Sequence, residues 1–273
     1  MDSRPPLAVS LGDPAGVGPE LIAEAWAARE DELLHPFFVV EGKGLFPAAA
    51  ASRRTNVPLV PIAHPGEAAE AFAHGLPVLG SADHDWTPGL PTHDGAQLAF
   101  ASLTWATRLV IAGEASGLVT APISKARLAE VGWDYPGQTE FVAEACGVAR
   151  EDAVMMLAGP SLCTVPITVH EAIGLVPSLL TSDLIVRRAR TVAKVLARDF
   201  ALTHPRIAVC GLNPHAGDPN GDPEWTAGDR DPPADSGQGA GHAGAGAVLQ
   251  AILAATDADQ DPHWGDLGRH LGE

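Results

Sequence analysis

The sequence predicts an α/β protein with largely parallel sheets. Short runs of apolar and β-branched residues alternate along the chain with longer runs whose apolar residues recur at helical spacing. Glycine, proline and aspartate separate these runs, as expected where strands pass into loops. Such alternation is typical of parallel strands covered by helices. The 273 residues, 46% of them hydrophobic, can fill one large or two medium domains.

The first half of the chain follows this order from its beginning. Residues 6–11 are predicted to form a strand, residues 19–29 a helix and residues 37–40 a second strand. Pro19 fits the first helical turn because no hydrogen bond is lost there, and Glu20 places negative charge near the positive end of the helix. Between residues 61 and 91 turn-forming residues dominate, which predicts short strands and loops.

Later segments continue the alternation. Residues 95–113 are predicted to be helical, with Leu98, Ser102, Trp105 and Leu109 along one side. A strand over 117–121 leads to a helix that begins at Lys125. Further helices are expected over these ranges: 139–145, 182–202 and 246–255.

Two histidines follow predicted strands. The apolar segment 162–169 ends at His170, and a buried strand over 207–210 runs into a glycine- and proline-containing loop that carries His215. Because ligands of open α/β sheets bind outside the carboxyl ends of the strands, the two imidazoles could share a metal or a substrate. A surface or capping role for each histidine remains open.

Two loops carry other candidate residues. The glycine-rich loop 12–20 either offers helix N–H groups to an anion or is only a tight connection, and its Asp13 could cap the helix or orient a cation. In the loop 135–141, Thr139 could cap the next helix, and Gln138 supplies donors and an acceptor for a phosphate or hydroxyl ligand.

Composition limits the possible partners. With 17 basic and 34 acidic residues, the net charge of -17 opposes docking on nucleic acid or anionic membranes. No apolar run approaches a membrane span and no signal peptide is recognisable, so the expected location is the cytoplasm. Cys146, Cys163 and Cys210 are widely spaced in apolar surroundings and are expected to be reduced core residues.

Four ordered segments make a resemblance specific: SLGDPAGVGPELI, LVTAPISKARL, YPGQTEFVAEACG and VCGLNPHAGD. Together they resemble the 4-hydroxythreonine-4-phosphate dehydrogenase family of pyridoxal phosphate biosynthesis, from about residue 6 to residue 218. The resemblance implies a two-lobed α/β subunit similar to the isocitrate and isopropylmalate dehydrogenases. It also implies a homodimer in which both subunits contribute to the active site.

The resemblance also implies a site. His170 and His215 correspond to two of three histidine ligands of a divalent metal, which could be zinc, cobalt or magnesium. Gln138 and Thr139 fall on the family's His-Thr substrate-binding pair, with glutamine in place of histidine. Lys125 and Asp13 remain catalytic candidates with no assigned role, and the cofactor contacts remain unknown.

The implied reaction is oxidation of the C3 hydroxyl of 4-phosphooxy-L-threonine, a small phosphorylated amino acid, with NAD or NADP as hydride acceptor. The resulting 3-oxo acid loses carbon dioxide and gives 3-amino-2-oxopropyl phosphate. A metal cation would lower the pKa of the hydroxyl group and stabilise the alkoxide.

The segment after Asp218 departs from the family pattern. Residues 1–218 are therefore expected to form the dehydrogenase-like region, whose two lobes have no fixed boundary. Residues 219–273 form a Gly-, Asp- and Pro-rich tail, for which disorder and a frameshift are the two explanations. The family's third histidine ligand has no counterpart in this tail. Two alternatives follow: a dehydrogenase of another phosphorylated four-carbon hydroxy acid, or a catalytically impaired, truncated homologue that only binds ligands.

Overall fold

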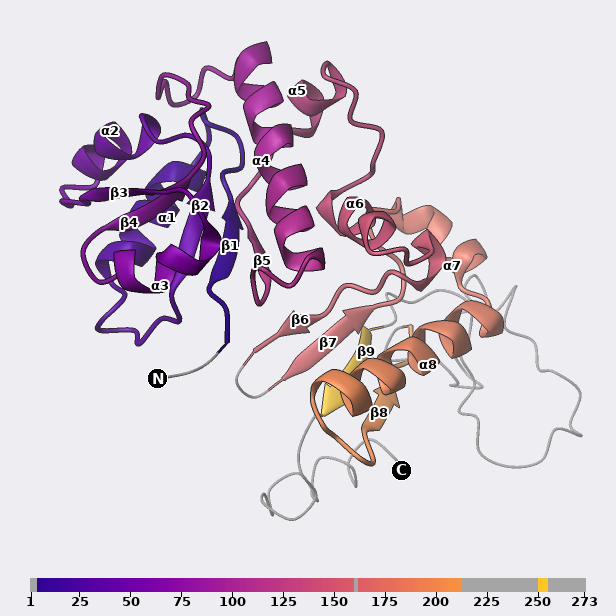
Figure 1. The fold of residues 1–273 in the computed structure, drawn as a ribbon. Helices are drawn as coiled ribbons and strands as arrows, with labels where there is room; N and C mark the ends of the chain where they lie inside the picture. The colour runs from indigo at the N-terminus through magenta and orange to yellow at the C-terminus, as the bar shows by residue number, and fades with distance from the viewer. Residues whose placement is uncertain (1–3, 160–161, 213–249, 255–273) are drawn as a thin grey trace, which may run out of the picture. The chain divides into compact units, whose positions relative to one another are not determined.

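The structure is a computed structural model that describes residues 4–159, 162–212 and 250–254 (Figure 1). The chain divides into two compact units, Met1–Val148 and Ala149–Glu273. The boundary expected at residue 218 lies outside the described residues, so it stays a prediction.

The first unit contains a sheet of five parallel strands in the order β3-β4-β2-β1-β5. In the central pair, Ala8 lies opposite Phe38, and on the other side of β1 it lies opposite Leu118. The predicted α/β fold with a parallel sheet is therefore confirmed. The strands are β1 (Leu7–Ser10), β2 (Phe37–Val40), β3 (Leu59–Ile62), β4 (Leu76–Leu79) and β5 (Leu118–Thr120).

Helices cover both faces of this sheet because its strands are apolar on both sides. Val9 and Val39 face Trp26 of α1 and Phe46 of α2, whereas Phe38 lies on the opposite face in the cluster that contains Leu109 of α4. The helical segments are α1 (Gly18–Ala27), α2 (Leu45–Ser52), the 3-10 turn η1 (Pro65–Glu67), α3 (Ala68–Ala71), α4 (His93–Ile111), α5 (Lys125–Ala129) and α6 (Gln138–Ala145).

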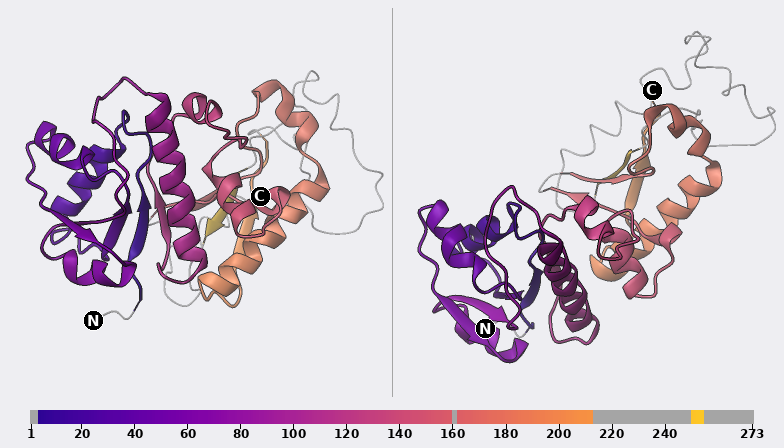
Figure 2. Two further views of the ribbon diagram at one scale, coloured as in Figure 1. Left: turned by 45° about the horizontal axis from the view of Figure 1, so that its top comes forward. Right: turned by 90° about the horizontal axis from the view of Figure 1, so that it is seen from above.

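Helix α4 lies along the sheet beside β1 and β5, and both views of Figure 2 show it next to the strands. Its first turn is capped by Thr92, whose hydroxyl accepts a hydrogen bond from the Gly95 amide. Ser102 is fully buried on the predicted side of the helix. Its hydroxyl accepts from the Leu11 amide at 2.9 Å and donates to the Val40 carbonyl at 2.7 Å, so it links α4 to the ends of β1 and β2.

The second unit contains a four-stranded sheet in the order β6-β7-β9-β8, whose pairs are antiparallel. Val192 and Leu196 of α8 pack with Val165 of β7 in its main apolar cluster. The parallel arrangement predicted for the sheets thus holds in the first unit only. The elements are η2 (Arg150–Asp152), β6 (Leu157–Ala158), β7 (Cys163–Pro166), η3 (Ile173–Leu175), α7 (Val176–Leu179), α8 (Ser182–Asp199), β8 (Arg206–Val209) and β9 (Gln250–Ala254).

Three expectations about the second unit and the cysteines are wrong. The helix expected over 246–255 is replaced by β9, which fills the position between β7 and β8 because these strands would otherwise leave their backbone groups unpaired. Strand β8 exposes most of its side chains and is not a buried strand. All three cysteines are free as expected, but Cys146 is exposed, and Cys163 and Cys210 are only partly buried.

Candidate active site

The loops after β1 and β5 meet at the carboxyl edge of the parallel sheet. The chain runs from β1 to β2 on one side, whereas β5 adds to the other side of β1. This reversal makes the carboxyl edge between β1 and β5 the topological switch point, where open α/β sheets bind their ligands. The residues around this point therefore form the candidate site of the first unit.

Glycines allow the two loops to approach closely. The Asp13 amide donates to the Pro122 carbonyl at 2.8 Å. Gly12 has a φ of +73°, and a Cβ atom there would lie 2.5 Å from the Pro122 carbonyl oxygen. A Cβ atom on Gly18 would lie 2.7 Å from the Leu11 carbonyl oxygen. The backbone turn therefore requires both glycines, whether or not the loop binds an anion.

Asp13 shapes this loop from within. Its carboxylate accepts from the Ala15 amide at 2.9 Å, and its carbonyl accepts from the Gly16 amide at 2.9 Å. Helix α1 begins after Val17 with no side-chain cap, so the expectation that Asp13 could cap this helix is wrong. No described contact assigns Asp13 a cationic partner, and its catalytic role stays a prediction.

Gln138 reaches the same sheet edge from the start of α6. Its Nε2 atom donates to the Ala121 carbonyl at 3.3 Å. Its Oε1 atom is buried and has no hydrogen-bond partner among the described residues. Thr139 is exposed in the first turn and does not cap α6, because Gly137 occupies the N-cap position.

Lys125 lies next to Gln138. It is exposed and begins α5, as predicted. A Cβ atom on Gly137 would lie 3.9 Å from the Lys125 Nζ atom, so the ammonium group is close to the backbone that precedes Gln138. The structure thus brings together three of the residues singled out in the sequence: Asp13, Lys125 and Gln138.

A cluster of four aromatic rings supports the loop that carries Gln138. Trp133 stacks on Phe141 with ring centroids 5.3 Å apart, and Phe100 and Tyr135 contact both rings edge-on. The Trp133 indole donates to the Tyr135 carbonyl at 2.6 Å, and the Tyr135 hydroxyl donates to Glu144 at 2.8 Å. This support was not predicted from the sequence, because Trp133, Tyr135 and Phe141 lie around the loop but Phe100 comes from the distant helix α4.

Glu41 also lies at the carboxyl edge of this sheet and was not predicted as a site residue from the sequence. It follows β2 with a left-handed φ of +69°, and its carboxylate accepts from the Ala82 amide at 2.5 Å. Burial raises the pKa of the Glu41 carboxyl, and the charge of Asp83 acts in the same direction. Hydrogen bonds from the Ala82 and Ser81 backbones oppose this shift. The Glu-Gly pair directly after FFVV is the sequence signal that could have drawn attention to this turn.

His170 belongs to the second unit. It is exposed, follows the bend after β7 and has a left-handed φ of +61°, which is uncommon for a residue other than glycine. His215 lies outside the described residues. Within residues 4–159, 162–212 and 250–254, no group of three His, Cys, Asp or Glu side chains is placed to hold a metal ion. The pairing of His170 with His215 therefore stays a prediction.

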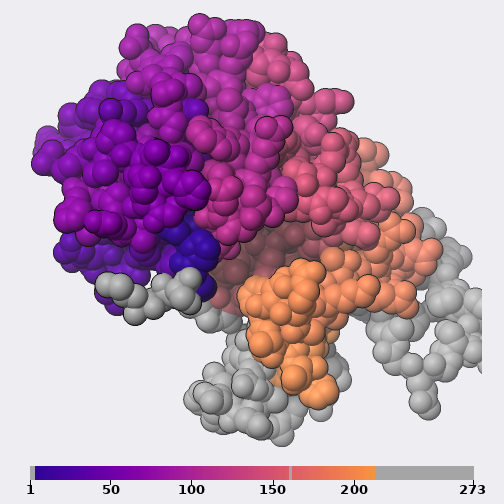
Figure 3. All heavy atoms as spheres, in the orientation of Figure 1, coloured from indigo at the N-terminus to yellow at the C-terminus, as the bar shows by residue number. Residues whose placement is uncertain are grey.

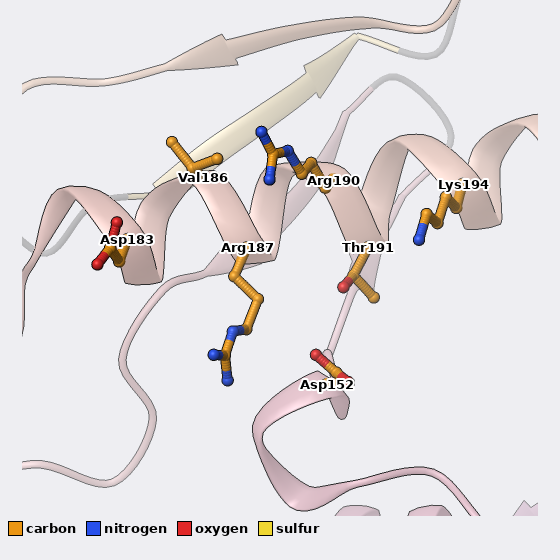
Figure 4. A pocket seen from close by; sticks show the side chains of 7 residues that line it. All are labelled: Asp152, Asp183, Val186, Arg187, Arg190, Thr191 and Lys194. Atoms are coloured by element: carbon orange, nitrogen blue, oxygen red, sulfur yellow. The ribbon is translucent and has the colours of Figure 1, made fainter.

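Helix α8 carries many charged residues and belongs to the orange part of the chain in Figure 3. A shallow depression of about 330 Å³ is lined by Asp152, Asp183, Val186, Arg187, Arg190, Thr191 and Lys194. In Figure 4, Arg187 and Lys194 point to one side of the helix and Arg190 to the other. Because the cations do not converge and two carboxylates share the lining, this surface is an ordinary solvated helix face.

Comparison with known proteins identifies the family. The family model described as pyridoxal phosphate biosynthetic protein PdxA matches residues 32–222. The chain belongs to the PdxA family. The 4-hydroxythreonine-4-phosphate dehydrogenase of Erythrobacter litoralis is 52% identical over 213 residues, which cover 78% of this chain and 63% of that protein. The enzyme of the same name from Zymomonas mobilis is 49% identical and is covered to 62%.

Solved PdxA-family structures agree with the fold. The 4-hydroxythreonine-4-phosphate dehydrogenase of Klebsiella pneumoniae superimposes with a TM-score of 0.66 at 30% identity, over 78% of this chain and 65% of that chain. The enzyme of that name from Burkholderia phymatum gives a TM-score of 0.60 at 26% identity, over 79% of this chain and 65% of that chain. The present chain thus spans somewhat less than two thirds of the length of each of these four relatives. Among the described residues, no helix has the length and apolar character required to cross a bilayer.

Proposed function

We propose that this chain is a metal-assisted dehydrogenase of 4-phosphooxy-L-threonine that uses NAD or NADP. The supporting observation is the family match over residues 32–222, which includes the sheet-edge loops around Lys125 and Gln138. The product of oxidation is the 3-oxo acid, which decarboxylates to 3-amino-2-oxopropyl phosphate. This reaction belongs to the pyridoxal phosphate route that names the family.

The residues of the first unit are suited to hold the substrate. The Lys125 ammonium is exposed near Gly137 and can attract a phosphate group, despite the negative charge of the whole chain. Thr139 offers an exposed hydroxyl in the first turn of α6, where backbone N–H groups also favour an anion. We propose Gln138 and Thr139 as substrate-binding residues and Lys125 as an orienting cation.

We further propose that His170 and His215 hold a divalent ion, which could be zinc, cobalt or magnesium. When bound, this ion would lower the pKa of the substrate hydroxyl and stabilise the alkoxide. The imidazole of His170 is exposed and can serve as a ligand. Other groups must complete the ion's coordination. A homodimer, in which a second copy supplies such groups, is part of the proposal.

A second candidate is a dehydrogenase of another phosphorylated four-carbon hydroxy acid. It is favoured by Gln138, a neutral amide at the position where the family resemblance places histidine, because such a change can alter substrate choice. A catalytically impaired homologue is the remaining alternative, since the sequence after Asp218 departs from the family pattern.

One assay of the purified chain separates these proposals. Formation of NADH or NADPH is followed with 4-phosphooxy-L-threonine, phosphorylated erythronate or phosphorylated threonate, with each metal in turn. The proposal expects turnover of the amino-acid phosphate and a loss of at least about a hundredfold in His170→Ala and His215→Ala. His204→Ala, in the exposed turn before β8, is the matched control and should leave turnover unchanged. If either the His170 or the His215 variant is as active as the unaltered chain, the metal assignment is refuted.

A further inference from the structure

The side-chain amide of Gln138 has a fixed orientation. Its Nε2 atom donates to the Ala121 carbonyl, which can only accept a hydrogen bond. If the amide were flipped, its Oε1 atom would face that carbonyl oxygen, and two acceptors would repel each other. The acceptor at the end of β5 therefore decides which way the amide points, independently of how the two atoms are assigned.

This orientation leaves the carbonyl oxygen of the Gln138 amide without a donor. With Nε2 committed to Ala121, the buried Oε1 atom is an acceptor with no partner among the described residues. A buried carbonyl without a donor is unfavourable, and a group that supplies the missing donor relieves this cost. An N–H or O–H group of a ligand can supply such a donor.

A phosphate group does not meet this requirement. Near neutral pH a phosphomonoester is mostly a dianion, and its terminal oxygens are acceptors that would repel Oε1. The substrate of the proposed function has two other groups that donate, the C2 ammonium and the C3 hydroxyl. Gln138 therefore differs in chemistry from histidine at this position, since histidine can direct an N–H group or a positive charge at phosphate.

We propose that Gln138 selects substrates through its carbonyl oxygen, which accepts a hydrogen bond from a hydroxyl or ammonium group on the carbon chain of the ligand and does not bind its phosphate. This inference rests on the proposed function for the class of substrate. Oε1 is buried, so a neighbouring group must shift before a donor on a ligand reaches it.

Binding measurements test the inference without requiring turnover. Dissociation constants are measured by calorimetry for 4-phosphooxy-L-threonine and for inorganic phosphate, on the unaltered chain and on Gln138→Met, which keeps the side-chain length and removes the acceptor. The amino-acid phosphate should bind about tenfold more weakly to the variant, whereas the affinity for inorganic phosphate should not change. An equal loss for both ligands, or no loss for either, would overturn the inference. Gln97→Met, the same replacement at an exposed glutamine of α4, is the matched control and should leave both affinities unchanged.

Three analogues of the substrate identify which of its groups donates the hydrogen bond. They also test the inference on the unaltered chain if Gln138→Met fails to fold. The first keeps only the ammonium group, the second keeps only the hydroxyl group, and the third, 4-phosphooxybutanoate, has neither. The unaltered chain should bind one of the first two about tenfold more tightly than the third. Equal affinity for all three would overturn the inference.

Failure of the inference and failure of the proposed function give different results. If 4-phosphooxy-L-threonine binds with the expected dependence on Gln138 but is not oxidised, the proposed activity is wrong and the assignment of Gln138 holds. If oxidation occurs but the affinities do not depend on the donor, the activity holds and the assignment of Gln138 is wrong. If no phosphorylated four-carbon compound binds, both are wrong.

Discussion

Replacing Gly12 with alanine should destabilise the first unit more than the same replacement at another left-handed glycine. Gly12 has a φ of +73°, a conformation that costs an alanine roughly 1–2 kcal/mol. The new Cβ atom would also lie 2.5 Å from the Pro122 oxygen and 2.8 Å from the Ala121 Cβ atom. Because the closest contact is backbone, the loops must separate, at a further cost of about 1–3 kcal/mol.

Gly113→Ala is the matched control. Its φ is +75°, and a Cβ atom there meets nothing within 4 Å, so it carries the conformational cost alone. Loss of glycine also restricts the unfolded chain in both variants, and this effect cancels in the comparison. Urea unfolding, followed by tryptophan fluorescence, should therefore show Gly12→Ala to be about 1–3 kcal/mol less stable than Gly113→Ala. If the two variants are equally stable, the close approach of the β1 and β5 loops is not as described.

Three other predictions concern stability. Ser102→Ala should lower the free energy of unfolding by about 2 kcal/mol, because it leaves the Leu11 amide and the Val40 carbonyl unpaired. Ser10→Ala should be neutral or stabilising, because the buried Ser10 hydroxyl has no described partner. Equal urea midpoints for the two variants would contradict this. Burial raises the pKa of Glu41, so the stabilising contribution of its protonated carboxyl is present below the ordinary glutamate pKa and is lost as the pH rises through the raised value. Glu41→Gln should therefore gain stability relative to the unaltered chain as the pH approaches neutrality. A stability difference that is constant with pH would refute this. Leu196→Ala should destabilise the second unit by about 2–4 kcal/mol in thermal unfolding, whereas Ala197→Ser on the exposed side of α8 should change it by less than about 0.5 kcal/mol.

Local patterns in the sequence predicted most of the first unit. The continuous apolar run FFVV gave β2 its observed bounds, and the first residue of α5 is Lys125 as expected. Helix α4 buries Leu98, Ser102 and Leu109 on the side expected from their spacing. These elements were predictable because each is determined by the period of its own residues.

Features that depend on distant parts of the chain were not predictable. Strand β9 has the composition of a helix, and only its two neighbouring strands make it extended. The orientation of the Gln138 amide is likewise determined by Ala121, which lies 17 positions earlier in the sequence. The motif resemblance placed Gln138 at the site but could not indicate which end of its amide faces a ligand.

The position of β9 has a consequence for synthesis of the protein. The parallel sheet of the first unit needs no residue beyond β5, so its hydrogen bonds can form while the remaining half of the chain is still on the ribosome. The second sheet cannot form at that stage, because its inner strand β9 is separated from the end of β8 by 40 residues that are translated first. During that interval β7 and β8 expose unpaired backbone groups, which can recruit a strand from another nascent chain. Chaperones that shield such edges should therefore raise the fraction of chains with a folded second unit more than the fraction with a folded first unit.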